Sequence, residues 1–172
     1  MPEPPDPAAP SSAARGADAF WAFSLAFYER PGIAETCLDL QDRDGIDVNI
    51  LLLCCWLGWS GQGRLRHEDF HAVEAGVAAW RSQIVERLRS VRRALKEMAA
   101  PAASALRRDI LRLELTAERE AQRLLLAGLT RGLVASGENF ADAECSLVTY
   151  LAIRDCRPDR AAPLLDALRK FG

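Results

Sequence analysis

The strongest constraint on the fold of this chain is an unbroken apolar run at residues 50–57. A helix through this run is hydrophobic on every side, so packed neighbours must surround it. The wider stretch at residues 46–59 contains Asp47 and Asn49 and has only 14 residues, whereas a membrane-spanning helix needs about 20. The run therefore predicts a soluble helical bundle built around a buried central helix at about residues 47–59.

Helix signals lie on both sides of this central helix. Apolar and aromatic residues fall on one face of residues 17–30, and a shorter helical pattern follows at residues 33–42. Asp47 is a suitable N-cap, because its short carboxylate can accept a hydrogen bond from a free backbone N–H of the first turn. Gly58 opens a glycine-rich loop, which predicts the end of the central helix.

Two long amphipathic segments come next. Apolar residues recur at steps of three and four over residues 77–98 and again over residues 106–124. Pro101 lies in the short connection between them, which predicts an antiparallel helical hairpin over about residues 68–133. A kink is expected near residues 80–82.

The two ends of the chain differ in composition. Residues 1–16 contain five of the nine prolines, and such a segment buries too little apolar surface to offset the entropy of ordering, so we expect a disordered tail. Residues 17–172 are expected to form a single domain, with further helices at residues 141–154 and from Pro158 onward. No stretch alternates with period two for long enough to predict a strand, so the fold class is all-α.

The cysteines indicate a reducing compartment. The chain has five, an odd number, without a CxxC pair or a secretory leader. Cys54 and Cys55 are adjacent within the apolar run, where reduced thiols pack as small hydrophobic groups. We therefore expect reduced thiols and a cytoplasmic location.

Charge is distributed unevenly. Residues 1–80 carry five basic and 12 acidic side chains, whereas residues 81–131 carry 12 basic and six acidic ones. Such blocks either dock on each other within one fold or face separate partners. The candidate partner-binding residues are Arg81, Arg89, Arg92, Arg93 and Lys96.

These basic residues have three interpretations. Leu88, Val91 and Leu95 are expected on the packed face of the hairpin, which would leave the charges pointing outward or sideward. They could then meet an acidic protein partner, or pair with Glu114, Glu118 and Glu120 across the hairpin. Nucleic acid is not expected as a partner, because no aromatic residues lie between the arginines to stack on bases.

The four tryptophans and the polar start of the central helix suggest a second kind of site. Tryptophans in the core half of a chain are more often packing residues than a ligand cage. If a pocket exists, these rings should line it, with polar side chains as anchors. The candidate ligand-binding residues are Trp21, Gln41, Asp47, Asn49, Trp56 and Trp80.

One short motif raises the possibility of metal chemistry. The sequence His67-Glu68-Asp69-Phe70-His71 matches the HExxH pattern of zinc proteases. It follows a glycine loop at a predicted helix start, where acidic residues are expected in any case. The chain contains no third histidine, and the acidic residues around Gly45 do not follow the order of an EF-hand loop. We predict no metal, no cofactor and no catalytic residues.

A longer pattern resembles a known family. It consists of Trp21-x-Phe23-Ser24, Tyr28, Cys37-Leu38-x-Leu40-Gln41, Gly45, Asp47-Val48-Asn49, the Leu-rich run to Trp56, Trp80-Arg81 and Leu88-Arg89-x-x-Arg92-Arg93-x-Leu95-Lys96. Over roughly residues 18–125, the chain resembles a proteobacterial family of short conserved hypothetical proteins that form a domain of unknown function. The resemblance implies no activity. His67 and His71 do not belong to the pattern, which weakens the zinc interpretation further.

Three functions remain in order of preference. The first is a non-enzymatic interaction module that presents the hairpin to an acidic protein or to a second copy of itself. The second is a bundle that binds a small apolar ligand, and the third is a metal-dependent hydrolase. A pocket of several hundred Å³ beside Asn49 would favour the ligand binder. An exposed apolar stripe on the hairpin would favour the interaction module.

Overall fold

The computed structural model describes residues 12–129 and 132–171 and is all-α, as the periodicity predicts. The elements are α1 (Ser12–Tyr28), α2 (Ile33–Asp44), α3 (Val48–Trp59), α4 (His67–Trp80), the π-helical segment η1 (Arg81–Val85), α5 (Glu86–Lys96), α6 (Ala103–Ala127), α7 (Asn139–Ile153), the 3₁₀ turn η2 (Pro158–Ala161) and α8 (Ala162–Arg169). Residues 1–11 of the predicted disordered tail lie outside the described residues, and α1 begins five residues before the predicted start.

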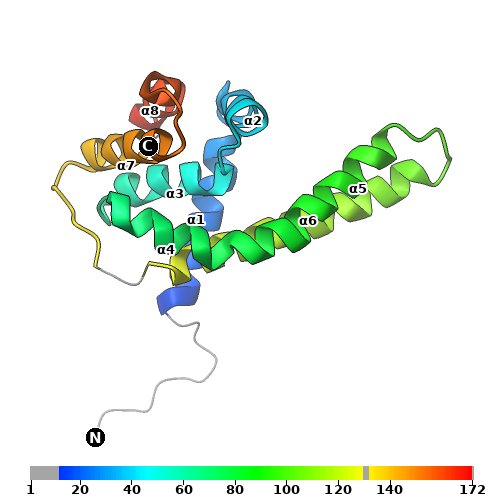
Figure 1. The fold of residues 1–172 in the computed structure, drawn as a ribbon, viewed down its shortest axis with the longest axis horizontal. Coiled ribbons are helices and arrows are strands. Elements are labelled where there is room, and N and C mark those ends of the chain that lie inside the picture. The colour runs from blue at the N-terminus through cyan, green and yellow to red at the C-terminus, as the bar shows by residue number, and fades with distance from the viewer. Residues whose placement is uncertain (1–11, 130–131, 172) are drawn as a thin grey trace, which may run out of the picture.

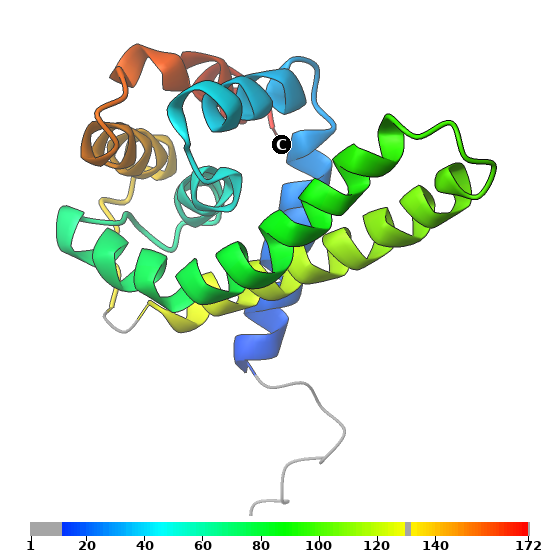
Figure 2. The same cartoon turned by 45° about the vertical axis from the view of Figure 1, so that its right-hand side comes forward.

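The helices divide into a bundle and a long arm. Figure 1 shows α1, α2, α3, α7 and α8 gathered at one end, with α5 and the first part of α6 extending away from them. Figure 2 shows the same arm from a second direction, again projecting past the bundle. We call α5, the loop after it and the paired part of α6 the arm. No helix among the described residues is long and apolar enough to cross a membrane.

The predicted central helix is the core of the bundle. Ten consecutive residues of α3, from Asn49 to Gly58, are buried. They are covered by α1, α2, α6, α7 and α8, which all pack against α3. Asp47 is the N-cap of α3, because its side chain accepts a hydrogen bond from the backbone N–H of Asn49 at 2.9 Å. Both the buried helix and its cap confirm what the sequence predicts.

The hairpin is also as predicted, with one local irregularity. α4, η1 and α5 form one continuous helical rod that packs antiparallel along α6. The helix widens into π geometry over Arg81–Val85 (η1), which overlaps the place where a kink is expected, and the kink itself stays a prediction. The second helix ends at Ala127, six residues before the predicted boundary.

The apolar stripe of the arm is turned partly toward solvent. Val91 is 45% exposed, Met98 58%, Leu106 48% and Leu113 55%. A π-helical turn contains about one more residue than an α-helical turn, so it rotates the helix that follows by about 100°. The apolar stripe includes the buried Val77 in α4, but after this rotation it no longer lies on the packed side of α5 at Val91. The prediction that Val91 belongs to the packed face is wrong, and the extra residue in η1 is the reason.

Two helices of the bundle approach each other at a glycine. A Cβ added to Gly58 in α3 would lie 2.5 Å from both the Cβ and the backbone N of Ala143 in α7. Gly76 in α4 differs, since the nearest atom to an added Cβ is the carbonyl oxygen of Leu124 at 3.6 Å. The close packing of α3 on α7 therefore depends on the missing side chain at Gly58.

We predict that Gly58→Ala lowers the free energy of unfolding by about 1–3 kcal/mol, because the added methyl group overpacks the α3–α7 contact. Gly76→Ala is the matched control and should raise it by up to about 1 kcal/mol, because alanine favours a helix where space is available. Urea unfolding of both variants measures the difference. Equal effects of the two substitutions would contradict the close contact.

Candidate functional site

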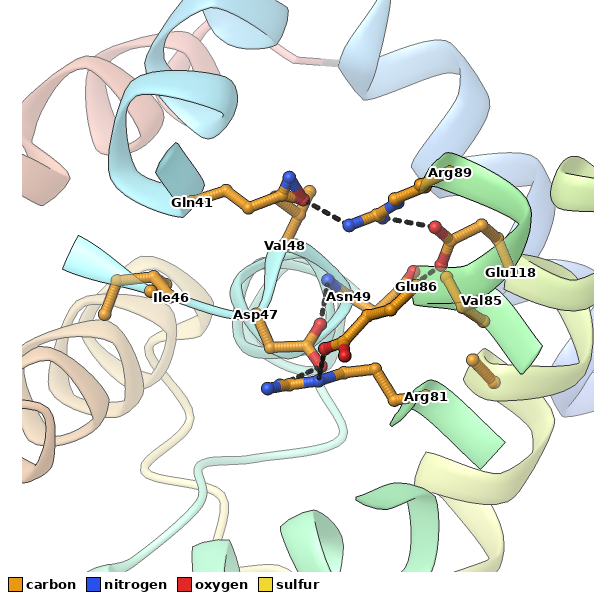
Figure 3. Close-up of a pocket in the computed structure, with 12 residues that line it drawn as sticks. Gln41, Ile46, Asp47, Val48, Asn49, Arg81, Val85, Glu86, Arg89 and Glu118 are labelled. Atoms are coloured by element: carbon orange, nitrogen blue, oxygen red, sulfur yellow. Dashed lines mark hydrogen bonds and ion pairs between the residues drawn. The ribbon is translucent and has the colours of Figure 1, made fainter. Parts of the chain in front are cut away.

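A cluster of charged and amide side chains joins the arm to the start of α3. Figure 3 shows Asp47 and Asn49, at the start of α3, facing Arg81 of η1 and Arg89 of α5. Oδ2 of Asp47 accepts a hydrogen bond from Nη1 of Arg81 at 2.9 Å. Oδ1 of the same carboxylate caps α3. One side chain therefore begins the central helix and also holds η1 against it.

Arg89 is the centre of the second half of the cluster. Its guanidinium donates to Oε1 of Gln41 in α2 at 2.7 Å and also pairs with Glu118 in α6. The other oxygen of Glu118 accepts a hydrogen bond from Nδ2 of Asn49 at 2.6 Å. Arg89 thus connects α5 with α2 and α6, and the Glu118 carboxylate connects α6 with α3 (Figure 3). We call the residues Gln41, Asp47, Asn49, Arg81, Arg89 and Glu118 the polar network.

Further polar side chains extend this network along α6 and into the bundle. Nε2 of Gln122 donates to Oδ1 of Asn49 and to the hydroxyl of Ser24, both at 3.0 Å. Its carbonyl oxygen is buried without a hydrogen-bond partner among the described residues. Glu114 lies one helical turn of α6 before Glu118, and its carboxylate pairs with Arg92. Ion pairs therefore form part of the contact between α5 and α6.

Burial raises the pKa of two groups that contact the α3 start, Glu118 and Tyr150. The Glu118 side chain is only 13% exposed, and burial raises its pKa above the ordinary value despite the nearby Arg89 guanidinium, which acts in the opposite direction. Burial also raises the pKa of the Tyr150 hydroxyl. That hydroxyl accepts a hydrogen bond from the backbone N–H of Asp47 at 3.1 Å, which ties α7 to the cap of α3.

Two cavities lie on either side of Asn49. One of about 140 Å³ is lined by members of the network and by Val85. The other, about 220 Å³, lies between α1, α2 and the arm and includes Trp21 and Gln122 in its wall. Gln41, Asn49, Arg89 and Glu118 border both cavities. Both are smaller than the roughly 300–1,000 Å³ of pockets that bind drug-sized ligands.

The tryptophans do not line a common pocket. Trp21 borders the larger cavity. Trp56 is buried and stacks on Phe20, with 5.1 Å between the ring centroids. Trp80 donates from its indole N–H to the carbonyl oxygen of Ala117 at 2.9 Å and so fastens α4 to α6. Of the six candidate ligand-binding residues, Trp21, Gln41, Asp47 and Asn49 border a cavity, whereas Trp56 and Trp80 serve packing.

The five candidate partner-binding residues also separate into two groups. Arg81, Arg89 and Arg92 form ion pairs with carboxylates of the fold. For Arg89 and Arg92 these carboxylates are Glu118 and Glu114 of α6, which confirms the predicted pairing across the hairpin. Arg93 is exposed and pairs loosely with Asp42 at 3.5 Å. Lys96 is exposed and makes no ion pair within the part of the chain that the structure describes. The rotation that η1 introduces into α5 accounts for the inward direction of Arg89 and Arg92.

The HExxH match forms the beginning of α4. His67 and His71 are both exposed. The Asp69 carboxylate accepts a hydrogen bond from the backbone N–H of Arg66 at 2.9 Å, which is part of a capping box. Among the described residues, no group of three or more histidine, cysteine or acidic side chains is placed to hold a metal ion.

The polar network lies in a part of the chain that matches a known protein family. A family model described as a protein of unknown function, DUF2390, matches residues 19–125. The chain belongs to the DUF2390 family, which confirms the resemblance seen in the sequence. The DUF2390 region contains every member of the polar network as well as Glu114 and Gln122. No curated protein and no solved structure matches the chain.

Asp47 offers a test of the network. We predict that Asp47→Ala lowers the free energy of unfolding by about 2 kcal/mol, because α3 loses its cap and Arg81 loses its partner. Asp47→Asn is the matched control, since its amide oxygen can still accept the capping hydrogen bond, and it should cost about half as much. Chemical denaturation of both variants provides the comparison. If the two variants are equally stable, the cap contributes nothing.

A second pair of variants distinguishes inward from outward arginines. Arg89→Gln should lower the free energy of unfolding by about 2 kcal/mol, because it leaves the buried Glu118 carboxylate without its charge partner. Arg93→Gln should change it by less than about 0.5 kcal/mol, because that pair is exposed. Thermal and urea unfolding measure both. A small effect at Arg89 would show that the ionic contact is dispensable.

Proposed function

We propose that this chain is a non-enzymatic interaction module that uses the arm to dock an acidic protein partner. The supporting observation is the concentration of exposed apolar residues on the arm. Among the described residues, six of the 12 exposed large apolar side chains lie there. They are Val91, Met98, Leu106, Leu111, Leu113 and Leu115. Apolar surface that the fold leaves uncovered in one region marks an interaction site.

The side of the arm that faces α1 and α2 has the character needed for an acidic partner. Leu111 and Leu115 lie there on α6, beside the cavity of about 220 Å³ and the hollow next to it. Arg107 and Arg108 border that same hollow and make no ion pair within the described part of the chain. We call Arg93, Arg107, Arg108, Leu111 and Leu115 the basic groove.

An amphipathic helix with acidic flanks fits the basic groove best. Its apolar residues would cover Leu111 and Leu115, in the manner of helices that dock in grooves. Its acidic residues would approach Arg107 and Arg108, and this complementarity would raise the association rate and select against basic partners. Arg89 and Arg92 would contribute indirectly, because their internal ion pairs hold the arm in place.

The alternatives identified in the sequence receive less support. A ligand binder would need a larger cavity beside Asn49 than the two found there. The buried carbonyl oxygen of Gln122, which lacks a partner among the described residues, is the feature that most favours a ligand with a hydrogen-bond donor. A hydrolase would need a convergent set of metal-binding side chains, and His67 and His71 instead lie exposed at a helix start.

Site-specific photo-crosslinking tests the proposed function. A photoreactive amino acid at position 111 in the full chain should capture a protein from a host lysate through a peptide rich in acidic and apolar residues. The same probe at Val148, an exposed residue of α7, is the matched control and should not capture it. Capture should fall in high salt and in the double variant Arg107→Gln and Arg108→Gln.

Two results would contradict the proposal. One is capture of the same peptides from positions 111 and 148, which would indicate nonspecific contact. The other is capture that is unaffected by salt and by loss of the two arginines, which would remove the electrostatic basis for an acidic partner.

A further inference from the structure

We propose that the opposite face of the arm binds a second copy of this chain. This face contains an exposed line of apolar residues on each helix, with half-buried residues between them. We call it the outer seam, and it consists of Leu88 and Val91 on α5, Met98 in the loop after α5, and Leu106, Ile110 and Leu113 on α6. The proposal shares the arm with the proposed function but uses a different surface.

The polar network determines which side of α5 faces away from the bundle. Arg89 reaches Gln41 in α2, and Arg93 reaches Asp42 in the same helix. These contacts place the side of α5 that carries the two arginines toward the bundle. Val91 projects about 160° around the helix from Arg89, given 100° per residue. It therefore lies on the side of α5 that is turned away from α2.

The same reasoning orients α6. Glu118 and Gln122 face the bundle, because they contact Asn49 in α3. Leu113 is five residues before Glu118, which places it about 140° around the helix. Leu106 is two turns earlier on the same side. The exposed residues of α5 and α6 thus form one continuous face of the arm.

The spacing of this face is that of a helix-packing seam. On α6, Leu106 and Leu113 are seven residues apart with Ile110 between them, and on α5 Leu88 and Val91 are three residues apart. A repeat of seven residues keeps apolar side chains aligned along a partner helix of the same period. Within the arm this partner is missing, because ion pairs occupy much of the contact between α5 and α6.

Charge favours a second copy over the acidic partner of the basic groove. Beside the outer seam, Asp109 pairs with Arg112 and Glu120 pairs with Arg123 within α6. Arg87 of α5 is one residue from Leu88 and is exposed. A nearly neutral apolar seam of heptad spacing is complemented by another seam of the same kind, and a second copy supplies one. A twofold dimer uses one patch twice, so such a patch must be complementary to itself.

An antiparallel arrangement satisfies both helices. A twofold axis near Leu113 would bring the two copies of that residue together. The four arm helices would then form an antiparallel four-helix bundle. Because each arm projects from its own bundle (Figure 2), this arrangement leaves the two bundles at opposite ends. The basic grooves face away from the contact, so one dimer would present two of them.

Sedimentation of the full chain with a matched pair of variants tests the dimer. The wild-type chain should show a mass twice that of the 18.9 kDa monomer. Leu113→Glu should shift it to the monomer, because it places two carboxylates at the axis. Leu115→Glu is the control on the same helix, with similar exposure but on the side of the basic groove, and it should remain dimeric.

Disulfide trapping locates the contact without a destabilising charge. Leu113→Cys should give a covalent dimer on mild oxidation that a reductant reverses, whereas Leu115→Cys should give no more than the wild-type chain. A wild-type chain that is monomeric at all concentrations would overturn the proposal. Equal behaviour of the variants at 113 and 115 in either assay would overturn the assignment to the outer seam.

The two proposals fail separately. Loss of the dimer in Leu113→Glu, with photo-capture from position 111 retained, would support the outer seam regardless of the acidic partner. A dimer that forms normally while position 111 captures no acidic peptide would retain the outer seam and remove the basic groove.

Discussion

The arrangement of this molecule depends on the ionic contact between Arg89 and Glu118. The guanidinium reaches α2 through Gln41, and the carboxylate reaches α3 through Asn49. A buried ion pair often adds little net stability, because desolvation offsets much of the attraction. Here the ion pair selects one packing arrangement, because Arg89 and Glu118 meet only when α5 and α6 are each rotated correctly about their own axes. That rotation fixes the direction of the arm relative to the buried central helix.

The same contact explains why apolar residues face solvent. Two amphipathic helices ordinarily bury their apolar stripes against each other. In the arm, arginines and glutamates occupy much of that contact, and Val91 and Leu113 are left exposed. The fold thereby keeps ion pairs between α5 and α6, where apolar side chains could have packed instead. Exposed apolar surface of this kind is consistent with a surface that a partner covers.

The sequence predicts those features that depend on composition and local chemistry. The all-α class, the buried helix, its Asp47 cap and the hairpin follow from apolar periodicity and from turn residues. The inward direction of Arg89 and Arg92 could not be derived in the same way. A stripe drawn at steps of three and four from Val77 assumes a constant 100° per residue, and the extra residue in η1 breaks that assumption. Glu114 and Glu118, opposite the arginines, were the available signal for ionic pairing.

The π-helical segment therefore connects the fold to the proposed function. Without it, Val91 would continue the face of α4 that carries the buried Val73 and Val77, and Arg89 would turn away from α2. π-Helical turns are rare and occur frequently at functional sites. Here the turn replaces apolar packing within one chain by a polar contact and releases an apolar face. Val91 is the exposed α5 residue that this rotation turns toward solvent, and it joins the exposed Leu106 and Leu113 of α6 in the proposed outer seam.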